Sequence, residues 1–454
     1  MSEVSLPYLT IIVPVYGAPF HTKACLDSLA ATKDEVPGVE VLVLDDATPD
    51  EGFFAPLDDQ CRHHRFELVR NPVNLGFVGT CNRAFATVKQ GHVLLLNSDT
   101  VVFPGWLSEM VAAIADGVAS VTAVSNNASI YSLPSPDIDP FSADFTPADL
   151  AEVVRSCSSP GPIRVPTAVG FCMLLTRSAL DAVGGFDPRY GKGYAEEDDW
   201  CMRARRKGFT HQLASRAFVF HEGGASMTRA GVTEDGQVAR SENLALLESL
   251  HPEYWKLFHE FLAAPDIHLL RLDVSSAVLR VLRSRRPLIL HWLDADPFGV
   301  QPAAPEAPAR VLIDGLAREY LALVAHTSTD GYLELSWRAN EIVMHRLLAT
   351  SASVFKDRPA VAWERLADRI LELEKPDVLH LHSGDLASMA VLRAAQRRNI
   401  PVVISLDQSE EAHRIAQKLG ADPGVVVASD PSVNQTSALY DRLVNSEPRP
   451  EIDG

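Results

Sequence analysis

Short apolar runs alternate with helix-like stretches over the first hundred positions of the chain. The pattern predicts strands over residues 9–15, 40–44, 65–70 and 93–96 and helices over residues 21–31 and 78–89. Strands that alternate with helices imply a mostly parallel sheet, and ligands of such a sheet bind beyond the carboxyl ends of its strands. The acidic residues of this region lie at those ends.

The next part of the chain is less regular. Proline and serine become frequent between about residues 130 and 163, which is typical of an irregular loop, expected here over the site. Beyond this stretch the pattern predicts a strand over residues 171–176, a helix over residues 198–208 and a strand over residues 217–220 that leads to His221.

A second alternation of strands and helices begins after about residue 270. A strand is predicted over residues 287–292, followed by a proline-rich loop and further strands and helices to the end of the chain. We therefore expect three parts: an amino-terminal domain over residues 1–265, a helical linker over 266–286, and a second, smaller Rossmann-like α/β domain over 287–454.

Composition excludes several classes of protein. The 454 residues are 46% hydrophobic and 22% charged, a balance typical of globular domains and not of disordered chains. The 41 Lys and Arg against 59 Asp and Glu leave a formal charge of −18, so the chain repels nucleic acid. The six cysteines form no CxxC pair and are expected to be reduced.

No apolar run reaches the roughly 18 residues of a membrane span, and no cationic segment precedes the first apolar run. The protein is therefore expected in the cytoplasm. Residues 277–286 alternate apolar side chains with arginines, which leaves peripheral contact with the inner face of the cytoplasmic membrane open. A solvated helix end is the favoured interpretation of that segment.

Two acidic strand ends are the strongest chemical signal. Asp45 and Asp46 follow one predicted strand, and Asn97, Ser98 and Asp99 follow another. A nucleoside diphosphate needs hydrogen bonds to its base and a hard divalent cation at its pyrophosphate, with carboxylate oxygens as ligands. Asp99 suits the cation, and Asp46 could accept from a pyrimidine ring N–H. The alternative is that these residues only cap turns.

Seven motifs then point to a family. VPVYGAP, VLDDATPD, NPVNLGFVGTCNRA, LLLNSDT, GFCMLL, GGFDPRYGKGYAEEDDWCMRARRKG and FHEGGAS occur in this order over about residues 7–230. They resemble the motifs of family 2 glycosyltransferases of the GT-A fold, and most of all the bacterial rhamnosyltransferase-type members. The resemblance implies an α/β, Rossmann-like nucleotide-sugar domain of GT-A type followed by the second α/β domain.

The resemblance also implies roles for residues at the donor side of the site. The strand end from Pro14 to Tyr16 and the Asp45–Asp46 pair are expected to hold the base of the donor. By the same resemblance, the nucleotide is bordered by Asn74 and Gly76.

A divalent metal, Mg²⁺ or Mn²⁺, is the implied cofactor. The resemblance assigns Asp99 as its carboxylate ligand and places His221 beside the pyrophosphate, where a neutral imidazole can complete the metal shell. Asn97 replaces the first acid of the family's DxD triplet; it can ligate but brings no charge. The cation is therefore expected to bind mainly through the phosphates of the donor. An isolated histidine is otherwise usually structural.

The chemical step of an inverting transfer requires a carboxylate that deprotonates the acceptor hydroxyl. The candidates are Glu196, Glu197, Asp198 and Asp199. Crowding raises the pKa of some of them, although an acidic helix start produces the same cluster without catalysis. Resemblance to the family's ED motif favours Glu197, with Asp198 and Asp199 kept as alternatives.

Two aromatic residues flank this acidic cluster. Tyr194 and Trp200 are candidates for binding the sugar ring of the acceptor, and a buried core position is an equal alternative for Trp200.

The second domain carries a weaker resemblance. PDVLHLHSGDLAS and RRNIPVVISLDQ, within about residues 285–430, resemble the first half of family 4 glycosyltransferases of the GT-B fold. The domain is expected to be catalytically idle alone and to serve acceptor binding or assembly. His380, His382 and Asp385 follow one strand. A metal site at His380 and His382 is the weaker interpretation, because the sequence shows no third ligand.

Together these features predict an inverting glycosyltransferase. It would move a hexose, first of all rhamnose from dTDP-rhamnose and next a sugar from a UDP donor, to a hydroxyl of a bacterial surface glycan or lipid-linked acceptor. No organic cofactor is implied. The alternative is a non-catalytic glycan-binding or assembly scaffold. A nucleotidyltransferase is disfavoured, because residues 13–20 lack a glycine-rich, lysine-bearing phosphate loop.

Overall fold

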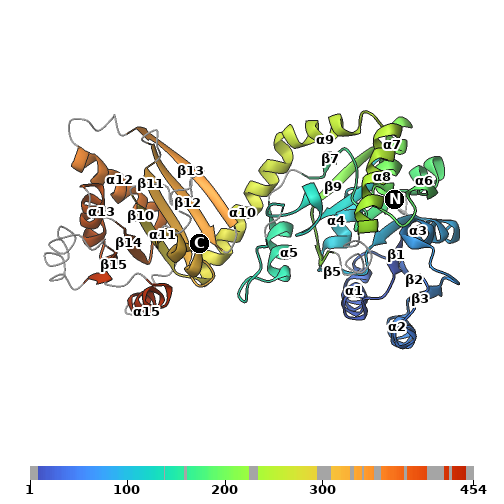
Figure 1. Ribbon diagram of the computed structural model, residues 1–454, viewed down its shortest axis with the longest axis horizontal. Helices are drawn as coiled ribbons and strands as arrows, with labels where there is room; N and C mark the ends of the chain where they lie inside the picture. The colour runs from blue at the N-terminus through green and yellow to red at the C-terminus, as the bar shows by residue number, and fades with distance from the viewer. Residues whose placement is uncertain are drawn as a thin grey trace, which may run out of the picture. The chain divides into compact units, whose positions relative to one another are not determined.

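The protein divides into two compact units, each with its own sheet (Figure 1). The computed structural model describes residues 9–136, 139–157, 161–223, 234–293, 308–327, 332–339, 342–351, 359–382, 386–405, 424–428 and 432–445. Unit 1 comprises Met1–Ile138 and Thr146–Ala277, and unit 2 comprises Asp139–Phe145 and Val278–Gly454.

Unit 1 is built on a nine-stranded mixed sheet in the order β3-β2-β1-β4-β8-β6-β9-β5, with β7 paired to β9. The first four strands of the chain are parallel, as the alternating pattern predicts: β1 (Leu9–Val15), β2 (Val39–Asp45), β3 (Glu67–Arg70) and β4 (His92–Leu96). Antiparallel pairing begins at the contact of β4 with β8. The remaining strands are β5 (Thr100–Val102), β6 (Val118–Val124), β7 (Ile163–Val165), β8 (Cys172–Leu175) and β9 (Thr210–His221).

Helices flank this sheet, and β1 and β4 are buried along nearly their whole length because helices cover both faces. The α-helices are α1 (Pro19–Thr32), α2 (Glu51–His64), α3 (Gly76–Thr87), α4 (Trp106–Ala112), α5 (Pro147–Ser156), α6 (Arg177–Val183), α7 (Glu196–Arg206), α8 (Glu234–Leu250), α9 (Tyr254–Ala263) and α10 (Pro265–Arg285). The short 3₁₀ turns are η1 (Lys33–Glu35), η2 (Ser129–Tyr131) and η3 (Pro188–Tyr190).

Helix α2 is absent from the predicted pattern, in which no helix separates the second and third strands. Pro56 lies inside it and removes one backbone donor. Phe53, Leu57 and Cys61, spaced four residues apart, are all buried, and the Asp50 side chain accepts from the backbone N–H of Gly52 at 2.9 Å. Burial of this apolar stripe and the cap outweigh the lost hydrogen bond.

The stretch from 130 to 163 is also more ordered than the expected loop, because it contains α5. A capping box begins this helix: the Thr146 hydroxyl accepts from the backbone N–H of Asp149, and the Asp149 carboxylate accepts from the backbone N–H of Thr146. Its own residues Leu150, Val153 and Val154 are buried against the rest of the unit. The frequent prolines obscure this helix in the sequence, although Pro147 at its first turn is compatible with it.

Unit 2 confirms the predicted second α/β domain. Its seven-stranded sheet has the order β13-β12-β11-β10-β14-β15-β16. The strands from β11 to β16 in that order are parallel, and β12 and β13 form an antiparallel hairpin that the sequence pattern does not predict. The strands are β10 (Leu288–Leu293), β11 (Leu321–Thr327), β12 (Tyr332–Ala339), β13 (Ile342–Ser351), β14 (Val378–Leu381), β15 (Val402–Ser405) and β16 (Val425–Ala428). The helices are α11 (Pro308–Leu316), α12 (Pro359–Glu374), α13 (Leu386–Arg397) and α15 (Val433–Val444).

Arginines near the end of α10 contact protein groups within unit 2. Arg283 pairs with Asp377 at 2.5 Å, and the nearly buried Arg286 donates from Nε to the Asp144 carboxylate at 2.7 Å. These contacts fix two of the basic side chains of segment 277–286 to the protein. In the part of the chain that the structure describes, no helix is both long enough and apolar enough to span a bilayer.

Candidate active site

The carboxyl ends of β1, β2 and β4 bring the predicted donor residues to one edge of the unit 1 sheet. Pro14 and Val15 are paired with Leu44 and Asp45 in parallel register. Tyr16, directly after β1, is 43% exposed, whereas Asp45 and Asp46 are buried. The exposed ring of Tyr16 is therefore accessible to a ligand at this edge.

Asp45 organises the turn after β2. It accepts from the backbone N–H of Thr48 at 3.1 Å and from the Thr48 hydroxyl at 2.6 Å, and its other oxygen lies 3.1 Å from Nε of Arg70. The Thr48 hydroxyl in turn accepts from the backbone N–H of Gly17, which ties the β1 turn to the β2 turn. Asp45 thus acts here as a turn cap, which is the alternative that the sequence leaves open.

Asp46 holds the beginning of α3. One carboxylate oxygen accepts from the Asn71 side chain at 2.7 Å and from the backbone N–H of Leu75 at 2.8 Å, and the other accepts from the backbone N–H of Gly76 at 2.9 Å. The Asn74 side chain also accepts from Gly76, at 3.0 Å. A carboxylate at a helix start satisfies amide donors that have no partner inside the helix. Asp46 therefore positions the segment from Asn74 to Gly76.

Replacing Asp46 by alanine should destabilise unit 1 by about 2–3 kcal/mol, because two backbone donors and one amide lose a charged acceptor. Urea unfolding of the full chain, followed through the unit 1 transition, measures this loss. Asp46→Asn keeps one acceptor oxygen and should lose less. An exposed control, Asp34→Ala, should leave the midpoint unchanged, and a midpoint equally unchanged in Asp46→Ala would contradict the positioning role.

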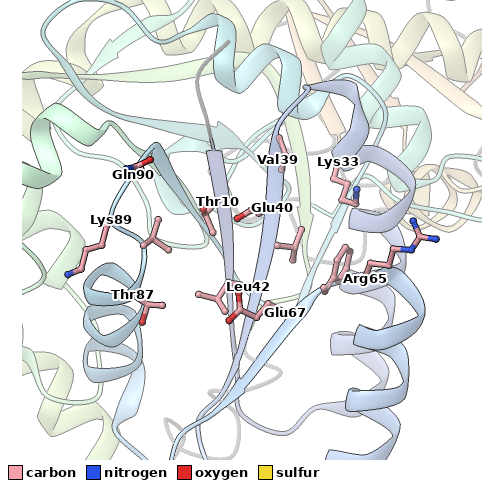
Figure 2. Close-up of a pocket in the computed structure, with 13 residues that line it drawn as sticks. Thr10, Lys33, Val39, Glu40, Leu42, Arg65, Glu67, Thr87, Lys89 and Gln90 are labelled. Atoms are coloured by element: carbon pink, nitrogen blue, oxygen red, sulfur yellow. The ribbon is translucent and has the colours of Figure 1, made fainter. Parts of the chain in front are cut away.

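Among the described residues of this unit, two of the cavities lie at opposite ends of the first strands. One, of about 370 Å³, is lined by the start of α3 and by the segment around η3, namely Asn74, Leu75, Gly76, Val78, Gly79, Asn82, Pro188, Gly191 and Lys192. The larger, of about 560 Å³, lies at the amino ends of β1, β2 and β3, where Figure 2 shows Lys33 and Arg65 on one side and Lys89 on the other. The first cavity contains the predicted nucleotide-bordering residues, and the second contains none of the predicted site residues.

Asp99 and His221 meet at the antiparallel contact of β5 with β9. Nε2 of His221 lies 3.4 Å from Oδ1 of Asp99, and Nδ1 of His221 lies 2.8 Å from the backbone carbonyl oxygen of Asn127. A carbonyl can only accept, so Nδ1 donates to it, and this hydrogen bond orients the ring with Nε2 toward Asp99. The Asn126 side chain accepts from the backbone N–H of His221 at 2.9 Å and donates to the His221 carbonyl at 3.0 Å. This oriented imidazole beside a buried carboxylate fits a divalent cation.

Backbone hydrogen bonds join Asn97 to two neighbours of this pair, Phe171 and Thr100. Its N–H donates to the carbonyl of Phe171 at 2.8 Å, and its carbonyl accepts from the Thr100 hydroxyl at 2.7 Å. The ring of Phe171 stacks on His221 with 5.1 Å between ring centroids and an interplanar angle of 18°. Phe171 thus joins the Asn97 turn to the imidazole of His221.

Glu197 lies beside the same segment. The backbone N–H of Gly170 donates to its Oε1 at 3.4 Å, and its Oε2 is buried without a hydrogen-bond partner. Burial raises the pKa of Glu197 above its usual range.

The neighbours Glu196 and Asp198 are also perturbed. Burial, and then the charge of Glu197, raises the pKa of Glu196 well above normal and that of Asp198 to about 8. Hydrogen bonds from Thr167 and Tyr254 partly oppose the effect at Asp198. The cluster therefore holds protons near neutral pH that isolated carboxyl groups would release.

The raised pKa of Asp198 predicts a pH-dependent stability. The folded chain keeps a proton that the unfolded chain has already lost above about pH 4, so the free energy of unfolding should fall by about 2 kcal/mol from pH 6 to pH 8. Asp198→Asn cannot titrate and should flatten that fall, which thermal unfolding at several pH values measures. Asp181→Asn, at an exposed position, is the matched control. An unchanged slope in Asp198→Asn would contradict the prediction.

Asp199 makes structural contacts with both of its oxygens. Nε of Arg203 lies 2.7 Å from one, and Nε2 of the buried His251 lies 2.8 Å from the other. Arg203 also donates to the carbonyls of Val183 and Gly185. Asp199 thus ties α7 to its surroundings. No motif in the sequence pointed to His251, which lies 52 residues further along the chain.

The two predicted acceptor aromatics lie in different environments. Trp200 is fully buried in the core, and its indole N–H donates to the Gly184 carbonyl at 2.8 Å. No face of Trp200 is open to a sugar, which agrees with the core alternative. Tyr194 is half-buried with φ +85°, and the guanidinium of Arg240 lies 4.1 Å from its ring centroid. Of this pair, only Tyr194 is partly accessible.

The strand ends that form this edge lie in a segment that matches a known protein family. Residues 10–184 match the family model of glycosyl transferase family 2, a segment that contains Asp46, Asn97 and Asp99. The uncharacterized proteins Mb1552 of Mycobacterium bovis and Rv1525 of Mycobacterium tuberculosis are each 29% identical to this chain over 227 residues, which cover 47% of this chain and 74% of theirs.

Solved structures resemble the chain weakly. GalNAc-T7 with UDP, GalNAc and Mn²⁺ is 15% identical with a TM-score of 0.38, over 48% of this chain and 44% of that one. The mannosyltransferase PcManGT from Pyrobaculum calidifontis, with GDP-Man and Mn²⁺, is 14% identical with a TM-score of 0.36, over 62% and 89%. S. aureus TarS 1-349 with UDP-GlcNAc is 15% identical with a TM-score of 0.35, over 61% and 82%. Substrates do not carry over to this chain at this level of similarity.

Proposed function

We propose that the chain is a glycosyltransferase with a family 2 domain of GT-A type in unit 1, where residues 10–184 match the model of that family, and that it transfers a hexosyl group from a nucleoside diphosphate with inversion. The acceptor is a hydroxyl of a bacterial surface glycan or a lipid-linked precursor. The preferred donor is dTDP-rhamnose, followed by UDP sugars. These specificities derive from the resemblance of the sequence motifs.

The proposal rests on one observation: the adjacent residues Gly170 and Phe171 contact the candidate base and the candidate cation site, respectively. Gly170 donates to the Glu197 carboxylate, and Phe171 stacks on His221, whose Nε2 faces Asp99. A candidate base and a candidate cation site therefore lie on either side of two adjacent residues. An inverting displacement needs this pair of groups around one anomeric carbon.

In the proposed mechanism, Glu197 accepts the proton of the acceptor hydroxyl as that oxygen forms its bond to the anomeric carbon. The bond from that carbon to the diphosphate oxygen breaks, and its electron pair leaves with the nucleoside diphosphate. Asp99 and His221, with Asn97 nearby, would hold Mg²⁺ or Mn²⁺, which neutralises charge on the diphosphate when bound. The raised pKa of Glu197 suits a base that works near neutral pH.

The donor and acceptor contacts complete the proposal. Pro14 and Tyr16 would line the base, and Asp45 and Asp46 would serve it indirectly by fixing the turn and the Asn74–Gly76 segment. Tyr194 would contact the acceptor. Unit 2 would bind the acceptor or support assembly.

A donor panel tests the proposal. The full chain is incubated with Mn²⁺, a set of dTDP, UDP and GDP sugars and a glycan acceptor, and the released nucleoside diphosphate is measured. Release that requires both metal and acceptor, with the anomeric configuration of the product inverted by NMR, is expected. Retention of configuration, or release from no donor, would overturn the proposal; the second result would favour a glycan-binding scaffold.

A further inference from the structure

The sheet of unit 2 gathers three histidines on one face. His291 on β10 is paired in parallel register with His380 on β14. The backbone N–H of His382 donates to the Trp292 carbonyl at 3.1 Å, which continues the same ladder by one step. Because side chains two residues apart on a strand share a face, His380 and His382 lie beside each other, and the register places His291 next to them.

The imidazole nitrogens of these residues converge. Nδ1 of His291 lies 3.0 Å from Nε2 of His382, and one nitrogen from each of the three rings lies within 4.8 Å of the others. The ring centroids of His380 and His382 are 4.1 Å apart. The ring centroid of His291 lies 5.4 Å from that of His380 and 5.3 Å from that of His382. Among the described residues, this is the only group of three or more His, Cys, Asp or Glu side chains that is close enough to share a metal ion.

We propose that His291, His380 and His382 form a binding site for a first-row transition-metal dication, with Zn²⁺ as the first choice. Imidazole is a preferred ligand of Zn²⁺, and three histidines with a fourth position open to water are a known coordination type. This site lies in unit 2 and is separate from the Asp99–His221 site of unit 1.

The geometry needs only a small adjustment. Two nitrogens bound to Zn²⁺ at about 2.0–2.1 Å in tetrahedral geometry lie about 3.3 Å apart. The 3.0 Å between Nδ1 of His291 and Nε2 of His382 is within a few tenths of an ångström of that separation. On binding, Nδ1 of His291 and Nε2 of His382 would exchange their mutual hydrogen bond for bonds to the metal.

His380 has hydrogen-bond partners that can orient its ring. Nδ1 contacts the Tyr440 hydroxyl of α15, and Nε2 lies 2.8 Å from the Ser405 hydroxyl of β15. Binding a metal exchanges one of these contacts, and the other holds the ring. Histidine ligands usually keep such a partner on the second nitrogen.

Burial and charge also suit neutral ligands. His291 and His380 are nearly inaccessible, and His382 is partly exposed. A buried site favours the neutral form of an imidazole, which is the form that binds a metal. The exposed side of His382 leaves a direction from which the fourth ligand, a water molecule, can enter.

The test uses the full chain carrying Asp99→Ala and His221→Ala, so that the unit 1 site is removed. After chelation and dialysis, Zn²⁺ and Co²⁺ are titrated, and bound metal is measured by elemental analysis and by the visible absorption of Co²⁺. One equivalent is expected, with the intense bands of a four- or five-coordinate ion. Absence of stoichiometric binding at micromolar protein would overturn the proposal.

Variants on this background identify the ligands. His291→Ala and His382→Ala should each weaken Zn²⁺ binding by about 10²-fold or more. His326→Ala, a buried histidine of the neighbouring strand β11, is the matched control and should bind Zn²⁺ as its parent does. Circular dichroism checks that each variant is folded. If a variant does not fold, the Co²⁺ spectrum of the parent decides, because six-coordinate, weakly absorbing Co²⁺ would contradict a three-histidine site. Equal binding in the triad variants and the control would also contradict it.

Discussion

Asp99→Ala is expected to abolish metal-dependent glycosyl transfer, with a loss on the order of 10³-fold or more in kcat/KM. Asp99 is the buried carboxylate that faces Nε2 of His221, and it is the charged protein ligand proposed for the cation. Without it, the leaving diphosphate loses the protein group that fixes its counter-ion. Initial rates of nucleoside diphosphate release, measured against Mn²⁺ concentration, determine the loss.

The metal dependence separates this effect from damage to the fold. Any residual rate in Asp99→Ala should no longer rise with Mn²⁺, and His221→Ala should show a smaller loss with a higher requirement for Mn²⁺. Asp181→Ala changes an aspartate of unit 1 that is 64% exposed and should keep the full rate. A rate in Asp99→Ala within a few-fold of the unsubstituted enzyme would remove Asp99 from the proposed site.

Glu197→Gln should lower kcat by on the order of 10²–10⁴-fold while leaving the affinity for the donor unchanged. Glutamine keeps the shape of glutamate and can still accept from the backbone N–H of Gly170, so the packing next to Phe171 is preserved. It cannot take a proton from the acceptor hydroxyl. Single-turnover rates together with calorimetric binding of the nucleoside diphosphate measure the two quantities separately.

The neighbouring carboxylates provide the comparison. Asp198→Asn and Glu196→Gln should reduce kcat less than Glu197→Gln does, and the exposed control Glu152→Gln should have no effect. With its pKa raised by burial, Glu197 is protonated and inactive at acid pH, so kcat should fall as the pH is lowered through that pKa. A normal rate in Glu197→Gln with a large loss in Asp198→Asn would move the base by one residue.

Strands β1, β2 and β4 were predictable because each is a mainly apolar run, whereas β3 has only Leu68 and Val69 between two charged residues. Helix α2 and the β12–β13 hairpin were not predictable, for different reasons. Pro56 interrupts the helical pattern of α2, and burial of Phe53, Leu57 and Cys61 together with the Asp50 cap compensates for it. The hairpin forms because antiparallel pairing extends the edge of an existing sheet at β11, a partner that local sequence does not specify.

The acidic helix start illustrates a limit of sequence reasoning. Glu196, Glu197, Asp198 and Asp199 are consecutive and chemically alike, but an α-helix turns by about 100° per residue, so the four side chains point in different directions. Packing places Glu197 beside Gly170, whereas Arg203 and His251 occupy the oxygens of Asp199. The same rotation buries Trp200, whereas Tyr194 precedes α7 and is partly accessible.

The sequence by itself determined the α/β class, the two sheets, the order of the motifs and the residue types that bind cations or protons, because these depend on local periodicity and side-chain chemistry. Only the tertiary structure decided which of those groups meet. His221 reaches Asp99 through the pairing of β5 with β9, and His291 reaches His380 through the register of β10 with β14. Strand pairing joins residues that are far apart in the chain, and it depends on the burial of the whole sheet more than on any local pattern.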